Sequence, residues 1–166
     1  MTDNKAAVLV VCLGNICRSP LGEALLRHHA ETAGLATAIT VDSAGTAGWH
    51  EGKPPSHGSI EAAARNGLDI TGQRSRPVVA EDFSRFDLIL AMDARNLADL
   101  KASAPKGAKA RIVRMMDYGT GEARDVPDPY GEPIEAFLEV FAMIDRAARG
   151  AIERLAATRG LQATSE

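Results

Sequence analysis

The chain has 166 residues, of which 45% are hydrophobic, and its formal net charge is −3 at pH 7. This length fits one domain with a substantial core, and the slightly acidic balance excludes the broad basic surface of a nucleic-acid-binding protein. The apolar run 6–12 is too short to span a membrane and lacks the flanks of a signal peptide. We therefore expect a cytoplasmic protein that contacts neither nucleic acid nor membrane, while export without a signal peptide stays open.

Strands and helices alternate along the first half of the chain. Residues 8–11 are apolar and rich in β-branched valine, as in a strand covered on both faces of a parallel sheet. Ser19 and Pro20 predict the N-cap and first turn of a helix that runs to about Gly34. Residues 39–43 predict a second strand.

A glycine- and proline-rich loop follows over residues 43–55. Ser56 is placed to cap a helix that reaches Asn66 and stops at Gly67. This stretch predicts a long, irregular connection that leads into a short helix.

The second half repeats the alternation. Residues 86–92 predict a third strand, Asp93 a cap for the next short helix, and residues 110–115 a fourth strand. A long final helix is predicted by one apolar stripe, made of Ile134, Phe137, Phe141, Ile144, Ala148, Ile152 and Leu155. We therefore expect a doubly wound α/β fold with a four-stranded parallel sheet and helices on both faces. Residues 1–160 would form a single domain and residues 161–166 a flexible tail.

The turn from Cys12 to Arg18 has the features of a phosphate-binding loop after the first strand. Successive backbone N–H groups ahead of a helix N-terminus form a concave site for an oxyanion. Gly14 and Asn15 tolerate the left-handed backbone that a tight cradle needs, and Arg18 offers a planar fork to two phosphate oxygens. The partial positive charge of the helix N-terminus and the charge of Arg18 favour Cys12 as a thiolate nucleophile. Ser19 is placed to hydrogen-bond its sulfur.

A second motif, Val126 to Tyr130, supplies a candidate acid. A phenolate leaving group needs a proton donor, and the two prolines beside Asp128 restrict the backbone that carries its carboxyl group. Alone, this motif is more often a plain turn. Together with the Cys12 loop, it favours Asp128 as a general acid.

The Cys12–Pro20 stretch, CLGNICRSP, resembles the phosphate loop of the low-molecular-weight protein tyrosine phosphatases. The resemblance extends to residues 43–46, 86–96 and 126–130 and so spans nearly the whole chain. It implies hydrolysis of phosphotyrosine and other aryl phosphates through a cysteinyl-phosphate intermediate. In that mechanism Cys12, Arg18 and Asp128 are catalytic, and Asp128 later activates the hydrolytic water.

The family resemblance also implies the other site residues. Substrate-binding roles fall to Leu13, Gly14, Asn15, Ile16, Cys17, Ser19, Trp49 and Tyr130, and supporting roles to Ser43 and Asp93. Ser43 would hold the side chain of Asn15, and Trp49 would form an aromatic wall. Tyr130 either forms the opposite wall or packs at the base of its loop. Cys17 is either a packing residue or a thiol that resolves oxidised Cys12.

Two positions depart from the family pattern. Gln73 stands where many members carry histidine, which leaves a histidine that supports the loop in doubt. A single tyrosine follows Asp128-Pro129, so the double tyrosine of animal members does not transfer.

Several alternative functions share parts of this pattern. An arsenate reductase needs further cysteines, and none follows Cys17. A phosphoarginine phosphatase would resemble this loop with threonine in place of Ile16. A phosphocarrier would have no use for Arg18 together with Asp128. A non-hydrolytic phosphopeptide-binding module would not need the nucleophile, the arginine and the acid together. We expect no metal or cofactor, because loop amides and Arg18 neutralise the phosphoryl group. The expected partners are phosphotyrosine proteins and a bacterial-type tyrosine kinase, and the expected state is a monomer or weak dimer.

Overall fold

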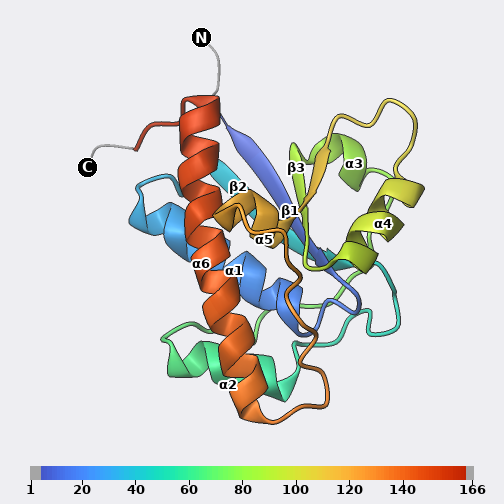
Figure 1. Ribbon diagram of the computed structural model, residues 1–166, viewed down its shortest axis with the longest axis vertical. Helices are drawn as coiled ribbons and strands as arrows, with labels where there is room; N and C mark the ends of the chain where they lie inside the picture. The colour runs from blue at the N-terminus through green and yellow to red at the C-terminus, as the bar shows by residue number, and fades with distance from the viewer. Residues whose placement is uncertain (1–4, 164–166) are drawn as a thin grey trace.

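The computed structural model describes residues 5–163 and contains a four-stranded, all-parallel sheet in the order β2-β1-β3-β4. Figure 1 shows the long helix α6 running past α5, α1 and α2 on one side of the molecule. The elements in chain order are β1 (Ala6–Cys12), α1 (Arg18–Thr32), β2 (Ile39–Gly45), α2 (His57–Arg65), α3 (Asp82–Arg85), β3 (Leu88–Ala91), α4 (Ala94–Ser103), β4 (Arg111–Arg114), α5 (Met115–Thr120) and α6 (Ile134–Arg159).

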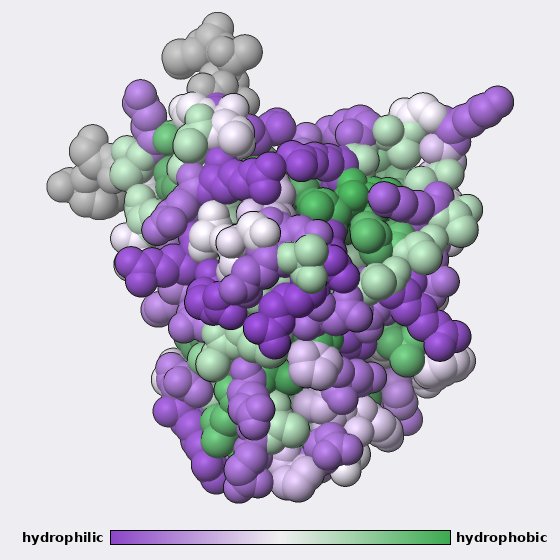
Figure 2. All heavy atoms as spheres, viewed as in Figure 1, coloured by the Kyte–Doolittle hydropathy of each residue, from purple (hydrophilic) through white to green (hydrophobic). Residues whose placement is uncertain are grey.

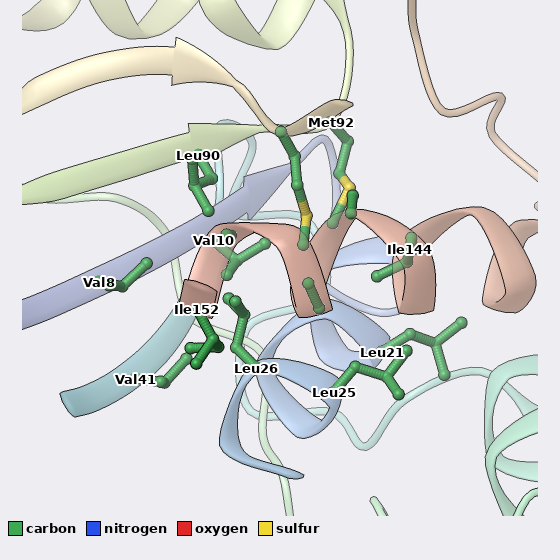
Figure 3. Packing of buried hydrophobic residues seen from close by; sticks show 14 of the residues in the cluster. Val8, Val10, Leu21, Leu25, Leu26, Val41, Leu90, Met92, Ile144 and Ile152 are labelled. Atoms are coloured by element: carbon green, nitrogen blue, oxygen red, sulfur yellow. The ribbon is translucent and has the colours of Figure 1, made fainter. Parts of the chain in front are cut away.

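Each face of the sheet has its own hydrophobic core. Because side chains alternate along a strand, Val8 and Val10 of β1 face one core and Leu9 and Val11 face the other. The larger core is shared with α1, α2, α5 and α6. Figure 3 shows how side chains of the strands meet those of α1 and α6 within it. The smaller core is covered by α3 and α4. The predicted α/β fold with helices on both faces is confirmed.

The strand order fixes where a ligand site can form. After β1 the chain adds β2 on one side and then returns to place β3 on the other side of β1. The carboxyl end of β1 is therefore the point at which the winding direction reverses, where doubly wound sheets bind their ligands. Cys12 is the last residue of β1.

Helix α6 confirms the predicted apolar stripe. Phe137, Phe141, Ile144 and Ile152 are buried against the larger core, and full burial of such a side chain contributes about 1.5–3 kcal/mol. On the face of the molecule drawn in Figure 2, hydrophilic residues cover much of the surface and apolar residues form smaller patches. The amphipathic pattern thus accounts for the orientation of this helix.

Some predicted boundaries differ from the observed ones. The first helix begins at Arg18 and ends at Thr32, so Ser19 lies inside it and is not its N-cap. The third strand is limited to β3 (Leu88–Ala91) because Phe86 is the C-cap of α3 and the strand pairing starts only at Leu88.

The fourth strand is β4 (Arg111–Arg114), and Met115, expected to end that strand, instead begins α5. The short helices α3 and α5 were not predicted from the sequence. With four and six residues they are too short to show a helical period.

The chain end also differs in part from the expectation. Leu161, assigned to the flexible tail, is buried in the larger core, and its N–H donates to the carbonyl of Ala156. The tail prediction for residues 164–166 lies outside the described residues. No helix within residues 5–163 has the length and apolar character required to cross a membrane.

Candidate active site

The segment from Cys12 to Arg18, termed the phosphate loop below, curls between β1 and α1. The loop that follows β2 holds its beginning, because Thr46 donates from its N–H to Cys12 O and Ala47 to Leu13 O, both at 2.9 Å. A Cβ at Gly45 would come within 2.7 Å of the Leu13 carbonyl, so this close approach requires glycine. Two strand ends thereby fix the curvature of the loop.

The phosphate loop leaves its backbone donors free. None of the N–H groups of residues 13–18 donates a hydrogen bond to another residue of the described chain. Asn15 has a φ of 56°, the only left-handed non-glycine conformation between residues 5 and 163. Unpaired N–H groups in a largely buried loop are costly unless a ligand accepts from them, so this backbone is built for an anion.

Cys12 carries its sulfur at the floor of this loop. The residue is 2% exposed, and Ser19 contacts its Sγ through Oγ at 3.1 Å and through its backbone N–H at 3.4 Å. Ser19 lies inside α1, and its hydroxyl faces the sulfur instead of capping the helix. Both groups of Ser19 can donate to a thiolate.

The side chain of Asn15 fixes the direction of these hydrogen bonds. Its Oδ1 accepts from the backbone N–H of Arg76 at 3.0 Å, so Nδ2 donates to Ser19 Oγ at 2.7 Å and to Ser43 Oγ at 3.1 Å. The hydroxyl proton of Ser19 is then left for Cys12 Sγ, which lies nearer than the Ala44 carbonyl at 3.5 Å. The predicted contact between Ser43 and Asn15 is confirmed.

Glu23 ends this network and was missed in the sequence. Its buried carboxyl group accepts from Ser43 Oγ at 2.6 Å and pairs with Arg27 at 3.0 Å. Burial raises the pKa of Glu23, although the hydrogen bond from Ser43 and the charge of Arg27 act in the opposite direction. Only the fold reveals this role, because an isolated glutamate in a helix is normally a surface residue.

Arg18 is buried at the closing end of the phosphate loop, with 2% of its side chain exposed. Its Nη1 donates to Asp93 Oδ2 at 2.7 Å and to the Val126 carbonyl at 2.9 Å, whereas its Nε has no partner within residues 5–163. Burial alone would lower the pKa of Arg18, but the charge of Cys12 and the hydrogen bond to Asp93 raise it overall. One edge of the guanidinium is thus fixed, and the Nε–Nη2 edge is left for a bidentate ligand.

Asp128 approaches the same site from the segment that precedes α6. Its carboxyl group lies 3.8 Å from Arg18 Nη2, and 42% of its side chain is exposed. Its Oδ1 accepts from the N–H of Tyr130 at 3.1 Å. The sequence prediction that Asp128 lies close to Cys12 and Arg18 is matched by a cavity that all three residues line.

This cavity has a volume of about 290 Å³ and combines a polar floor with an aromatic rim. Trp49 and Tyr130 are 71% and 62% exposed, so they stand at the rim and not in the core. His50 also lines the cavity, and its ring lies beside that of Tyr130 with 6.4 Å between centroids. The lining residues are Cys12, Leu13, Gly14, Ile16, Cys17, Arg18, Trp49, His50, Asp128 and Tyr130.

Two residues expected to bind substrate do not line the cavity. The side chains of Asn15 and Ser19 are buried behind the loop, where they hold its backbone and the sulfur. Asp93 caps α4 as predicted, because its Oδ1 accepts from the Asn96 N–H at 2.7 Å. Its second oxygen is free for Arg18 and makes the expected supporting contact.

Cys17 lines the cavity but differs from Cys12 in its surroundings. Its Sγ lies 3.3 Å from Ser56 Oγ, and its carbonyl accepts from Ser59 Oγ at 2.9 Å. Burial raises the pKa of Cys17 to about 11, which keeps it a neutral thiol near pH 7.

Gln73 occupies the position that departs from the family pattern. Its Nε2 donates to the Pro20 carbonyl at 3.0 Å in the first turn of α1, while its Oε1 is buried without a partner among the described residues. Gln73 thus braces the helix behind the phosphate loop through a neutral amide.

The comparisons with known proteins agree with this geometry. Residues 7–161 match the family described as low molecular weight phosphotyrosine protein phosphatase. The chain is 46% identical to the low molecular weight protein-tyrosine-phosphatase YfkJ of Bacillus subtilis, over 75% of this chain and 80% of that protein. A protein tyrosine phosphatase structure from Entamoeba histolytica matches with a TM-score of 0.88 and 35% identity, covering 93% of this chain and 99% of that one. A structure named as a Drosophila arginine phosphatase matches with a TM-score of 0.81 and 32% identity, covering 89% and 96%.

Proposed function

Because the chain belongs to the low molecular weight phosphotyrosine protein phosphatase family, we propose that it hydrolyses phosphotyrosine in proteins to tyrosine and inorganic phosphate. The observation that carries the proposal is the set of unpaired N–H groups of residues 13–18 around the sulfur of Cys12. These N–H groups can donate hydrogen bonds to several oxygens of a tetrahedral phosphate dianion at once, which a neutral ligand with fewer acceptors cannot match.

In the first step, Cys12 Sγ attacks phosphorus opposite the phenolic oxygen. The S–P bond forms while the P–O bond breaks, and the leaving oxygen takes a proton from Asp128. Charge on the remaining phosphoryl oxygens is stabilised by the loop N–H groups and by the Nε–Nη2 edge of Arg18. These donors are already oriented before the substrate binds, which lowers the cost of reorganisation.

In the second step, water attacks the cysteinyl phosphate. Asp128, now a carboxylate, removes a proton from the water while the S–P bond breaks and the electron pair returns to sulfur. Ser19 donates to the departing thiolate, which makes it a better leaving group. Inorganic phosphate then leaves, and Asp128 is again protonated.

The shape of the cavity supports an aromatic phosphate ester as the substrate. The sulfur lies at the floor, whereas Trp49 and Tyr130 stand exposed at the rim. A phenyl ring spans this depth and packs between aromatic side chains, whereas phosphoserine is short and offers no apolar surface. The apolar wall formed by Leu13 and Ile16 also favours a phenyl ring over the short side chain of phosphoserine.

Phosphoarginine is the second candidate substrate, because one structural neighbour is named as an arginine phosphatase. The apolar side chain of Ile16 argues against it, since the charged guanidinium would lose water without gaining a polar partner there.

Three further proposals rest on the sequence alone: a cytoplasmic location, a bacterial-type tyrosine kinase as partner, and a monomeric or weakly dimeric state.

A side-by-side assay tests the substrate class. Peptides of one sequence that carry phosphotyrosine, phosphoserine or phosphoarginine are incubated with the enzyme, and released phosphate is measured. We expect kcat/KM to be highest for phosphotyrosine by about 100-fold or more, because one missing complementary contact already costs tenfold or more. A higher value for phosphoarginine would overturn the assignment. Cys12→Ser is the control for contaminating phosphatases.

A further inference from the structure

The turn between β3 and α4 joins two parts of the active site. Met92 O accepts from the N–H of Val126 at 2.9 Å, and Asp93 Oδ2 accepts from Arg18 at 2.7 Å. The next residue, Ala94, donates from its N–H to Asp125 Oδ1 at 2.9 Å. Three consecutive residues therefore hold the phosphate-binding arginine and the segment that leads to Asp128.

Val126 and Asp125 both anchor the segment that leads to Asp128, and Val126 is the more deeply buried of the two. Its side chain is fully buried in the larger core, and its carbonyl accepts from Arg18 Nη1 at 2.9 Å. Its N–H, carbonyl and side chain are therefore all engaged two residues before Asp128. Downstream of Asp128, Tyr130 and Glu132 are exposed and their N–H groups bond only within this short segment, to Asp128 and Pro129.

Asp125 extends this anchor to a second strand. The oxygen that accepts from Ala94 also accepts from Arg114 Nη1 at 2.8 Å. Arg114 ends β4 and is itself held by Asp117, at 2.7 Å from Nε and 3.3 Å from Nη2. A carboxylate at the N-terminus of α4 is also favoured by the positive end of that helix. Asp125 thus joins the ends of two elements beside the catalytic cavity.

We propose that Asp125 is a positioning residue for the general acid, acting through the backbone of residues 125–128 to hold the carboxyl group of Asp128 over Cys12. This inference rests on the proposed function. As the S–P bond forms, the electron pair of the breaking P–O bond passes to the phenolic oxygen, which takes the proton of Asp128. A misplaced carboxyl group delays this proton transfer but leaves the sulfur and the phosphate donors in place.

The test uses the leaving group as a readout. Values of kcat/KM, which report the steps up to P–O cleavage, are measured for aryl phosphates whose phenols range from strongly acidic to weakly acidic. For Asp125→Ala we expect a loss of about 10-fold with the least acidic phenol and less than about 2-fold with the most acidic one. Asp125→Asn retains an acceptor for Ala94 but loses the charge that attracts Arg114, so its loss should be intermediate.

Two controls separate positioning from general damage. Glu122 lies on the same irregular segment as Asp125 and forms an exposed ion pair with Arg146. Glu122→Ala removes this pair and should leave every rate within about 2-fold. In an Asp128→Ala background, Asp125→Ala should cause no further loss, because the acid that it positions is absent. Thermal unfolding confirms that each variant is folded, and Asp125→Asn supplies the result if Asp125→Ala does not fold.

The proposal is overturned if Asp125→Ala lowers kcat/KM equally for all leaving groups, or if it adds its full loss to that of Asp128→Ala. Inactivity of the unaltered enzyme toward every aryl phosphate would refute the proposed function instead. The two failures are therefore distinguishable in one set of assays.

Discussion

Arg18 and Asp93 are 75 residues apart in the sequence, and a hydrogen bond of 2.7 Å joins their side chains. Asp93 divides its two oxygens between the N-terminus of α4 and the guanidinium of Arg18. Helix α4 and the phosphate loop are therefore mechanically connected. The orientation of Arg18 depends on a residue that does not itself line the cavity.

Asp93→Ala should weaken phosphate binding. The guanidinium of Arg18 is buried and Asp93 is partly exposed, and removal of one partner from such a hydrogen-bonded charge pair costs about 2–5 kcal/mol, part of which falls on the orientation of Arg18. We expect the inhibition constant of inorganic phosphate to rise about 10-fold or more, and the unfolding temperature to fall. Arg95→Ala, an exposed change in the same helix turn, is the matched control. An unchanged inhibition constant would show that Arg18 keeps its orientation without Asp93.

Asp128→Ala should lower kcat/KM by roughly 10²–10⁴-fold for a weakly acidic phenol and far less for a strongly acidic one. The loss should shrink as the phenol becomes more acidic, because an acidic phenol leaves without taking a proton. Equal losses for both leaving groups would count against Asp128 as the acid.

Glu23 should make the stability of the protein depend on pH. Burial raises the pKa of Glu23 in the folded state, whereas the unfolded chain has the ordinary value of about 4.3. Above that value the folded protein binds more protons than the unfolded chain, so the free energy of unfolding falls as pH rises towards the folded pKa. Glu23→Gln cannot ionise and removes this contribution.

We therefore expect the stability of Glu23→Gln relative to the unaltered protein to increase between about pH 4 and pH 7. Unfolding temperatures across this range measure it. Glu31→Gln, on the exposed side of the same helix, should track the unaltered protein. Parallel curves for Glu23→Gln and the unaltered protein would contradict the raised pKa.

The two cysteines should differ in reactivity. Burial raises the pKa of Cys17 to about 11, so it is a neutral thiol near pH 7, and only the thiolate reacts rapidly with an alkylating reagent. Iodoacetamide at pH 7 should label Cys12 first, with loss of activity, and inorganic phosphate should protect it. Peptide mapping identifies the labelled residue. Equal labelling of Cys17 in the folded protein would be inconsistent with this difference.

The sequence predicted those parts of the site whose residues are neighbours in the chain. Cys12, Arg18 and Ser19 fall within one turn, and the prolines beside Asp128 mark a restricted backbone. Strand and helix order followed from apolar periodicity. The exact ends did not, because Phe86 and Met115 are apolar whether they lie in a strand or beside one.

The parts missed by sequence reasoning depend on contacts between distant segments. Glu23 is recognisable only after β2 brings Ser43 against α1, and the carbonyl of Val126 carries no side-chain signal at all. In the sequence Asp125 has the features of an ordinary loop residue, and only the fold shows that it contacts the N-terminus of α4. His50 lines the cavity, but its loop has no periodic pattern in the sequence that would place it there.

Detection of the cysteinyl phosphate on Cys12 is the most direct test of the mechanism. The enzyme is mixed rapidly with p-nitrophenyl phosphate and quenched in acid, and its peptides are analysed by mass spectrometry. The account predicts one phosphoryl group on the peptide that contains Cys12, and neither that adduct nor turnover in Cys12→Ser. Phosphate on another residue, or full activity of Cys12→Ser, would contradict it.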